Sequence, residues 1–346
     1  MFSPKYTITN TLLANIKRIN TLVNELNNNR FPNIILLELE RIAREVSSYA
    51  STSIEGNPLP LTEVKKILKS KPAHSRDSEK EVLNYNQALQ DLNTMLDEGE
   101  VNLSLMLILH IQKQVTENLL PSFESGRLRE KPVVVNDPRS GQVVYLPPDV
   151  NEVKLLMEDL VQFTNNNRKV IDPLILAGVF HKQMVIIHPF TDGNGRTTRL
   201  ITKALLAAMG LNTFNLFSFE NYYNQNVTKY FQIVGEFGNY YDLVDKIDFT
   251  NWLEYFTEGI IDELLRVQKL LPKIAISPST QLKSPHLKML EYIDEKGFIS
   301  DREYAKLVNR AKATRTQDFK KLIELKLIQR KGKGRATYYV LKENEK

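Results

Sequence analysis

The sequence predicts a mainly α-helical protein with one short β-hairpin and a small basic domain at its C-terminal end. Apolar residues recur at spacings of three and four over most of the first 270 residues, which is the period of a packed helix. Two β-branched runs flank a turn-rich stretch near residue 140, as in a hairpin. Thirteen Lys/Arg against three acidic residues give residues 302–342 a net charge of +10.

Length and composition indicate a soluble protein of two or three domains. The 346 residues are 42% apolar and 25% charged, and we expect domains at 1–104, 105–270 and 280–346. No apolar run approaches about 18 residues and the start lacks a signal-peptide pattern, so we expect a cytoplasmic protein with no membrane contact. The absence of cysteine excludes disulfides, thiolate zinc sites and cysteine nucleophiles.

The first half of the chain is expected to be helical apart from the hairpin. Residues 11–54 have a helical pattern that stops at Gly56 and Pro58, where glycine can take the left-handed position after a helix. Further helices are predicted at 62–68, 78–96 and 103–119. An isolated hairpin from 133–135 and 143–146 is marginal alone, so it should lean on the helices or act as a movable flap.

The second half is expected to hold two buried helices joined by a loop. Asp172 and Pro173 begin a helix that is apolar nearly all round and ends at His188. A second apolar helix should end at Gly210, and aromatic-rich helices follow to about Leu270. After a linker at 277–280 we expect two helices, a third at 312–325, and strands at 327–329 and 337–340.

The loop between the two buried helices reads His-Pro-Phe-Thr-Asp-Gly-Asn-Gly-Arg-Thr-Thr-Arg at 188–199. Gly193 and Gly195 allow a tight turn and a close approach of ligand to backbone. Free N–H groups at the start of the next helix form an anion site. Arg196 and Arg199 are three residues apart on that helix, so both can reach a polyphosphate.

Two further residues of this loop suit catalysis. Asp192 offers the oxygen ligands that Mg²⁺ prefers, and His188 has an ordinary pKa of ~6.5 that suits proton abstraction. The alternative is a capped helix with two surface arginines and a histidine that only packs in the protein. We interpret the other four histidines of the chain as residues of this ordinary structural kind. Base, acid, paired glycines and paired arginines within twelve residues favour a site. P-loop, Rossmann and H-E-x-x-H motifs are absent from the sequence.

The loop resembles the Fic family motif His-Pro-Phe-x-Asp/Glu-Gly-Asn-Gly-Arg-x-x-Arg at every fixed position, and the similarity extends over residues 105–256. The resemblance implies a helical Fic core that transfers AMP from ATP to a Tyr, Ser or Thr hydroxyl of a protein. It implies His188 as the catalytic base and Asp192 as the ligand of Mg²⁺. The nucleotide-binding residues that it implies are Gly193, Asn194, Gly195, Arg196, Thr197, Thr198 and Arg199.

Two other segments resemble parts of the Fic fold. The hairpin at 133–146 is similar to the Fic flap, which holds the target segment by strand addition, although a plain surface hairpin is the alternative. Tyr230 and Phe231 align with a family pair, usually Tyr-Tyr, that lines the adenine pocket. Phe231 can stack on adenine but lacks the hydroxyl, and core packing is the competing interpretation.

Ser51 and Glu55, followed by Gly56, resemble the family's inhibitory motif Ser/Thr-x-x-x-Glu-Gly/Asn. A carboxylate in the last turn of a helix faces the negative end of its dipole, at a cost of about 0.3–1 kcal/mol, so we expect it to have a cationic partner. The resemblance implies that this partner is Arg199 and that the γ-phosphate is misplaced. A solvated Glu55 is the alternative. Since the motif precedes the core, the chain resembles a class II Fic protein.

The segment from Ser284 onward resembles a winged helix. Its recognition helix would present Thr314, Arg315, Gln317, Asp318 and Lys321, and residues 331–335 would form the wing tip. Such domains commonly bind DNA through phosphate contacts and base reading, here through residues 284–342. Many winged helices bind proteins instead, and the sequence leaves both open.

The leading functional hypothesis is therefore a protein AMP-transferase, autoinhibited by Glu55, that uses ATP and Mg²⁺. Removal of AMP by the same site, with Glu55 orienting a water, is a second hypothesis. A DNA-binding regulator whose core senses nucleotide is a third, although the intact His188 and Asp192 argue against an inactive core. The sequence decides neither the target protein nor whether the chain is a homodimer.

Overall fold

The computed structural model describes residues 2–28, 33–70, 72, 74–99, 101–136, 141–207, 218–275, 282–325 and 327–342. The expected hairpin turn at 137–140, the helix end at Gly210 and the linker at 277–280 lie outside these residues. The chain forms two units, 1–28 with 40–267 and 29–39 with 268–346. As the sequence predicts, the fold is mainly α-helical with few short strands.

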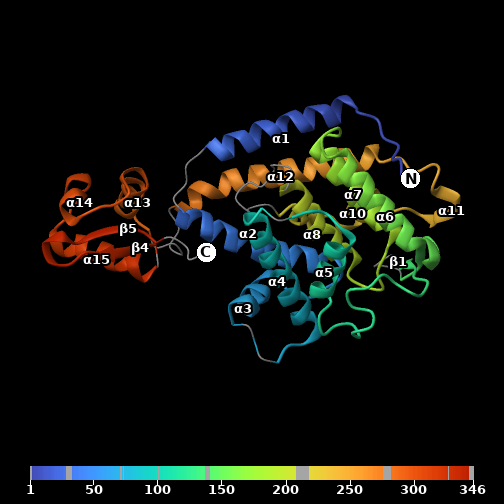
Figure 1. Ribbon diagram of the computed structural model, residues 1–346, viewed down its shortest axis with the longest axis horizontal. Helices are drawn as coiled ribbons and strands as arrows, with labels where there is room; N and C mark the ends of the chain where they lie inside the picture. Colours follow the sequence, from blue (N-terminus) through green and yellow to red (C-terminus); the bar gives the residue numbers. More distant parts are fainter. Residues whose placement is uncertain are drawn as a thin grey trace. The chain divides into compact units, whose positions relative to one another are not determined.

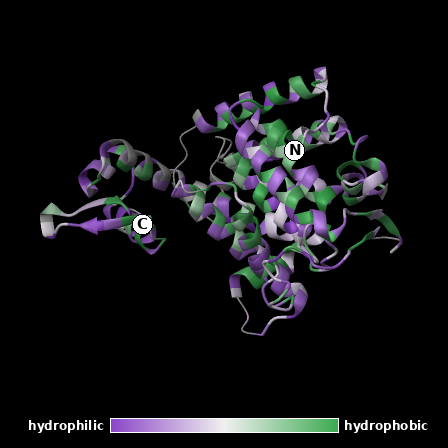
Figure 2. Cartoon of the chain, turned by 45° about the vertical axis from the view of Figure 1, so that its right-hand side comes forward, coloured by the Kyte–Doolittle hydropathy of each residue, from purple (hydrophilic) through white to green (hydrophobic). Residues whose placement is uncertain are grey.

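The first unit is built almost entirely from helices (Figure 1). Helix α1 lies along the first part of α12, where Asn15 Nδ2 donates to Thr257 Oγ1 over 3.0 Å. Most helices carry both polar and apolar residues along their length, as surface helices do (Figure 2). The helices are α1 (Asn10–Asn28), α2 (Asn33–Ile54), α3 (Leu61–Ser70), α4 (Asp77–Asp97), α5 (Leu105–Val115), α6 (Val150–Asn167), α7 (Pro173–Ile187), α8 (Asn194–Leu206), α9 (Glu220–Gln225), α10 (Val227–Val234), α11 (Tyr240–Leu243) and α12 (Thr250–Ala275).

Helices α7 and α8 form the centre of this unit. The Asp172 side chain caps α7 by accepting from the Leu174 N–H over 2.9 Å, and nearly every residue of the helix is buried. Trp252 of α12 donates its indole N–H to the Gly178 carbonyl of α7 over 2.7 Å. Helix α8 contacts α4, α5 and α7. The loop between α7 and α8 is thus held by buried helices at both ends.

The expected hairpin is part of a three-stranded sheet rather than an isolated ribbon. Strands β1 (Val135–Asn136) and β2 (Val143–Leu146) are antiparallel, and β3 (Gly238–Asn239) pairs with β2 in parallel. Tyr145 of β2 is buried and donates its hydroxyl to the Ile186 carbonyl over 3.1 Å. The sheet is therefore anchored to the end of α7. Helix α6 was not predicted, although its buried residues follow helical spacing.

Besides the first residues of α2 and the last of α12, the second unit contains three helices followed by an antiparallel pair of strands. Its elements are α13 (Ser284–Lys296), α14 (Asp301–Leu307), α15 (Lys312–Glu324), β4 (Ile328–Lys331), the 3₁₀ turn Gly334–Ala336 and β5 (Tyr338–Leu341). A core of its own includes Met289, Ile293, Ile299, Phe319 and Leu322. This is the expected element order, and the winged-helix assignment stays a prediction.

The expectation that Asp318 and Arg315 face outward from α15 is wrong. Asp318 is 5% exposed and accepts from His286 Nε2, the Tyr304 hydroxyl and Arg310 Nη1, each at 2.8–2.9 Å. Arg315 pairs with Asp301 instead, over 2.8 and 3.0 Å. Both side chains therefore attach α15 to the rest of its unit. Such contacts are needed because α15 is a polar helix with few buried apolar residues.

Among the helices of the described residues, none combines the length and the apolar character needed to cross a bilayer.

Replacement of Asp318 by Asn should destabilise the second unit by about 3 kcal/mol, because it leaves three buried donors around an uncharged amide. Asp301→Asn is the matched control, since its partly exposed pair with Arg315 should be worth about 1 kcal/mol at most. The measurement is hydrogen exchange of the α15 and β4 amides. Equal protection of these amides in the two variants would contradict the structural role of Asp318.

Candidate active site at the start of helix α8

His188 ends α7 in an unusual backbone conformation. Its φ is +49°, in the left-handed region, which a residue with a Cβ adopts at a cost of about 1 kcal/mol or more. Two contacts hold it there. The His188 N–H donates to the Met184 carbonyl over 3.0 Å, and Arg129 Nε donates to the His188 carbonyl over 2.9 Å. Strain of this kind is typical of functional sites.

The surroundings of His188 keep its ring neutral. Burial lowers the pKa of His188 to about 4, although the nearby Glu55 and Asp192 carboxylates oppose that shift. A histidine with this pKa is unprotonated throughout the neutral range, because the neutral form dominates above pH 4. The ring can therefore accept a proton from a hydroxyl, as a general base must.

Asp192 and Arg196 form a two-pronged ion pair beside His188. Arg196 Nη2 donates to both oxygens of Asp192, over 3.0 and 2.9 Å, and the arginine side chain is 2% exposed. The Asp192 side chain is 49% exposed, so solvent reaches it. Gln112 of α5 donates to the Asp192 carbonyl over 3.1 Å and fixes the backbone of the loop.

The donor set at Asp192 fits a magnesium ion that is shared with phosphates. Mg²⁺ is commonly held by one or two carboxylates together with substrate phosphates. Within the described ranges there is no group of three or more acidic or histidine residues that could enclose a metal without a substrate. The half-exposed carboxylate paired with Arg196 matches the shared type of site.

The first turn of α8 presents glycines and main-chain N–H groups, and the Gly193 N–H just before the helix donates to Asp192 Oδ1 over 2.6 Å. Gly193 has a φ of +79° and precedes α8 as its N-cap, a conformation that favours glycine. Asn194 uses its side chain within the loop, exchanging hydrogen bonds with the Phe190 N–H and carbonyl over 2.9 and 2.8 Å. Thr198 is likewise bonded to the Asn194 carbonyl over 2.7 Å. Main-chain amides are thus the donors left for an anion.

Glu55 lies against this anion site. Its Oε1 accepts from Arg199 Nη2 over 2.7 Å, and a Cβ added to Gly195 would meet the same oxygen at 2.0 Å. Ser51 holds the arginine from one turn earlier, accepting from Nε at its hydroxyl and from Nη2 at its carbonyl, both over 2.8 Å. The left-handed Gly56, with φ of +95°, ends the helix as expected. The carboxylate therefore occupies space next to the amides of α8.

Arg129 joins the catalytic loop to the sheet, a role that sequence reasoning missed. Its side chain is buried and donates to the His188 carbonyl and, over 2.5 Å, to the Pro148 carbonyl just after β2. Its N–H donates to the Pro189 carbonyl over 2.9 Å. A lone arginine in a loop carries no sequence pattern, so nothing in the sequence pointed to it.

The two residues expected at the adenine site differ in their surroundings. Tyr230 is 1% exposed, stacks on Tyr223 at 4.6 Å between ring centroids and contacts His181 Nε2 over 3.1 Å. It packs among core aromatic residues, and its place in the adenine pocket stays a prediction. Phe231 is half-buried, so part of its ring is accessible. Thr197 is fully buried, and its hydroxyl has no hydrogen-bond partner within the described part of the chain.

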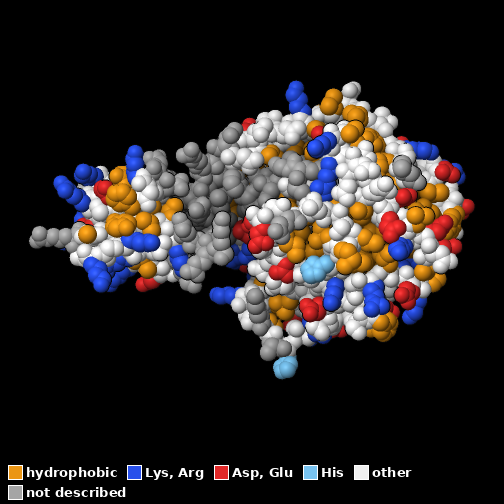
Figure 3. All heavy atoms as spheres, viewed as in Figure 1, with side chains coloured by type: hydrophobic (Ala, Val, Ile, Leu, Met, Phe, Trp, Pro, Cys, Tyr) orange, Lys and Arg blue, Asp and Glu red, His pale blue; other side chains and the backbone are white. Residues whose placement is uncertain are grey.

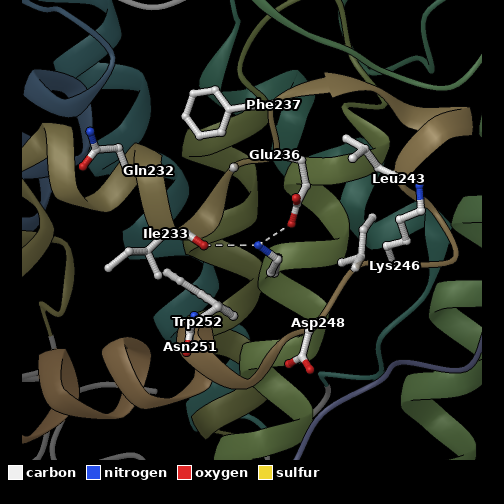
Figure 4. Close-up of a pocket in the computed structure, with 12 residues that line it drawn as sticks. Gln232, Ile233, Glu236, Phe237, Leu243, Lys246, Asp248, Asn251 and Trp252 are labelled. Atoms are coloured by element: carbon white, nitrogen blue, oxygen red, sulfur yellow. Dashed lines mark hydrogen bonds and ion pairs between the residues drawn. The ribbon is translucent and has the colours of Figure 1, made fainter.

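A separate cavity of about 290 Å³ lies beside β3, between α7, α10 and α12 (Figure 4). The buried Lys182 in its wall pairs with Glu236 over 2.8 Å and donates to the Ile233 carbonyl over 3.1 Å. Asp248 caps α12 by accepting from the Thr250 N–H over 2.7 Å. The charges of Lys182 and Asp248 are therefore satisfied by partners within the protein.

Comparisons with known proteins agree with this geometry. Residues 102–206 match the model of the Fic/DOC family. Two curated relatives are named protein adenylyltransferase Fic, from Aedes aegypti, and protein adenylyltransferase fic-1, from Caenorhabditis elegans. They are 30% identical over 217 residues and 33% identical over 180 residues, covering 57% and 50% of this chain. The chain spans less than half of either relative, 42% and 34% of their lengths.

Solved structures give the same result for the fold. A Fic family protein from Desulfovibrio desulfuricans aligns over 100% of both chains with a TM-score of 0.66 and 20% identity. Fic-1 from C. elegans aligns over 76% of this chain and 73% of that one, with a TM-score of 0.60 and 24% identity. Residues 102–206, which include the buried α7–loop–α8 unit with its histidine, aspartate and paired arginines, thus match the Fic/DOC family model, and the fold resembles those of solved Fic proteins.

Proposed function

We propose that this chain is a protein adenylyltransferase that moves AMP from ATP to a Tyr, Ser or Thr hydroxyl of a target protein. The observation that carries the proposal is the grouping of a buried histidine, a carboxylate and two arginines around the N-terminal turn of one helix. The names of the relatives support it, since each is called a protein adenylyltransferase. Cytoplasmic location and assembly into a homodimer are further hypotheses that rest on the sequence alone.

In the proposed reaction the target hydroxyl oxygen attacks the α-phosphorus of ATP. His188 takes the hydroxyl proton, the new P–O bond forms, and the bond to the β-phosphate breaks so that pyrophosphate leaves. The amide of Gly195, and that of Gly193 once it is released from Asp192, would stabilise the charge that develops on the phosphate oxygens. Arg196 and Arg199 would hold the β- and γ-phosphates by paired hydrogen bonds.

Asp192 would hold a magnesium ion together with the phosphates. A bound Mg²⁺ neutralises phosphate charge and orients the leaving group. Both carboxylate oxygens accept from Arg196 Nη2 in this structure, so Asp192 would share its charge between the arginine and the ion. If ATP draws Arg196 toward its phosphates, Asp192 would be better placed to hold the ion, and we expect the two ligands to bind cooperatively.

The hairpin formed by β1 and β2 would hold the target. Strand β1 lies at the edge of the three-stranded sheet, where a target strand could be added. Three exposed apolar side chains stand on or next to the two strands, Val134, Val143 and Leu146. Arg129 connects the base of this hairpin to the His188 carbonyl. A target segment on the hairpin would thereby be aligned with the base.

Glu55 would inhibit the transfer in the structure described here. Its carboxylate accepts from Arg199 and lies against Gly195, where a γ-phosphate would need the same arginine. ATP can then bind only with its α-phosphorus badly aligned. The same carboxylate is 30% exposed and could instead orient a water for removal of AMP, which is the second candidate reaction.

We further propose that the second unit binds duplex DNA through α15 and the β4–β5 strands. A four-residue turn joins α14 to α15, as in helix-turn-helix proteins whose second helix enters the major groove. The exposed polar residues of α15 include Lys312, Thr316, Gln317 and Lys320, side chains that contact phosphates or base edges. Lysines and arginines project from several sides of this unit (Figure 3).

Replacing His188 by Ala should lower AMP transfer by about 10²–10⁴-fold and change ATP affinity by less than about threefold, because the base acts on the acceptor. The measurement is incorporation of α-labelled ATP into protein, with ATP binding measured by calorimetry. His110→Ala, an exposed histidine on α5, is the matched control and should keep the wild-type rate. Transfer at an unchanged rate by the His188 variant would overturn the assignment.

Replacing Glu55 by Gly should raise the rate of AMP transfer, self-modification included, by at least about tenfold. Removal of the carboxylate frees Arg199 for the γ-phosphate, and an unfavourable charge leaves the helix end. The rates of wild type, Glu55→Gly, Arg199→Ala and the double variant are compared with saturating ATP and Mg²⁺.

Arg199→Ala should cancel the gain, since both changes act through one contact. An equal gain with and without Arg199 would retain the inhibition and reject the partner. A Glu55→Gly variant no faster than wild type would reject the inhibition itself.

For DNA binding, the full chain with Lys312→Ala and Lys320→Ala should bind duplex DNA more weakly, with the slope of log K against log salt reduced by about two. The control removes two exposed lysines at α13, Lys283→Ala and Lys288→Ala, and should bind as wild type. The measurement is fluorescence anisotropy from low to moderate salt. No binding by wild type at high micromolar protein in low salt would assign this unit to a protein partner instead.

A further inference from the structure

Helix α2 is held to α8 by a row of polar contacts that extends well beyond Glu55. The two helices run antiparallel here, and each contributes one residue per turn at intervals of four. At one end Glu55 contacts Arg199 and Gly195, and one turn back Ser51 contacts Arg199. We call this row the α2–α8 seam, and its members are Ser47, Ser51 and Glu55 on α2 with Lys203, Arg199 and Gly195 on α8.

The other end of the seam contains a buried ion pair. Lys203 Nζ donates to the Ser47 hydroxyl over 2.5 Å and lies 3.0 Å from Oε1 of Glu220, the first residue of α9. The same Glu220 oxygen accepts from the hydroxyls of Tyr85 on α4, over 2.7 Å, and of Ser47, over 3.1 Å. All four side chains are buried, and Glu220, Tyr85 and Ser47 are 0% exposed. Loss of one donor therefore leaves a buried charge poorly satisfied.

Helix α4 contacts both ends of the inhibitory segment. Glu81 lies one turn before Tyr85, and its Oε2 accepts from Asn57 Nδ2, just after the inhibitory motif, over 2.7 Å. Its Oε1 lies 3.8 Å from Arg196 Nη1. One face of α4 thus contacts the segment after α2 at one end of the seam and the Glu220 ion pair at the other.

We propose that Lys203, Glu220 and Tyr85 are positioning residues that set the place of Glu55 without touching the nucleotide. This inference rests on the inhibition by Glu55 proposed above. Ser47 and Glu55 are two turns apart, about 12 Å along the helix axis. Because a helix moves as a rigid rod, a weaker hold on Ser47 loosens the whole end of α2. Glu55 then leaves Arg199 more often, and the population of the active state rises.

The test is Tyr85→Phe in the full chain, which keeps the ring and removes the hydroxyl that bonds Glu220. We expect the rate of α-labelled AMP incorporation to rise about three- to tenfold, less than for Glu55→Gly. In the Glu55→Gly background the same change should have no effect, because the helix no longer carries an inhibitor. Hydrogen exchange of the amides at 47–54 should speed up, while exchange in α7 stays as in wild type.

Tyr49→Phe is the matched control, because that ring lies on α2 itself but packs on the cluster of Leu59, Val64 and Ile67. It should change neither rate nor exchange. Ser47→Ala is a second activating variant, for the case that Tyr85→Phe lowers stability overall. Unchanged rate and exchange in both variants would overturn the inference, as would equal gains with and without Glu55.

Rejection of the proposed inhibition by Glu55 would give a different experimental result from rejection of the positioning role. If Glu55→Gly does not activate, the inhibition by Glu55 is rejected. Exchange of the α2 amides still decides whether Tyr85 and Ser47 hold the helix: faster exchange in their variants supports the positioning role, and unchanged exchange rejects it.

Discussion

The contact of Glu55 with Arg199 and Gly195 is the interaction on which the arrangement of the active site depends. For this contact α2 must run antiparallel to α8, close enough for the buried guanidinium of Arg199 to bridge the two helices. Ser51 must also lie on the face of α2 that carries Glu55. The contact also requires a residue without a side chain at position 195. Burial of Arg199 without an anion would be costly, so the protein supplies a carboxylate when no phosphate is present.

Both arginines of the loop are neutralised by the protein's own acids. Arg199 is paired with Glu55 and Arg196 with Asp192. The site is thus electrostatically balanced by its own side chains. In the proposed reaction ATP would compete for both arginines, with Mg²⁺ relieving the pair with Asp192 and movement of α2 relieving the pair with Glu55.

Much of the site could be predicted because its chemistry is local in the sequence. Residues 188–199 are contiguous, so the spacing of His188, Asp192 and Arg199 already implies a shared loop and helix. The contacts that hold this loop could not be predicted, since Arg129 and Gln112 come from other elements and belong to no pattern. The prediction that Asp318 and Arg315 are exposed on α15 was wrong for a related reason. A charged residue on a basic helix looks solvent-exposed until its buried partners are known. Helix α6 was missed although its spacing was readable.

Gly195 bears on how the proposed inhibition by Glu55 could be lost by mutation. A side chain at this position would meet the Glu55 carboxylate and the Arg199 guanidinium, so it would have to displace them. Since the same side chain would stand beside the amides proposed to bind phosphate, a substitution at Gly195 would disturb both contacts at once. A variant that loses only the proposed inhibition would therefore have to change α2 or the residues that dock it.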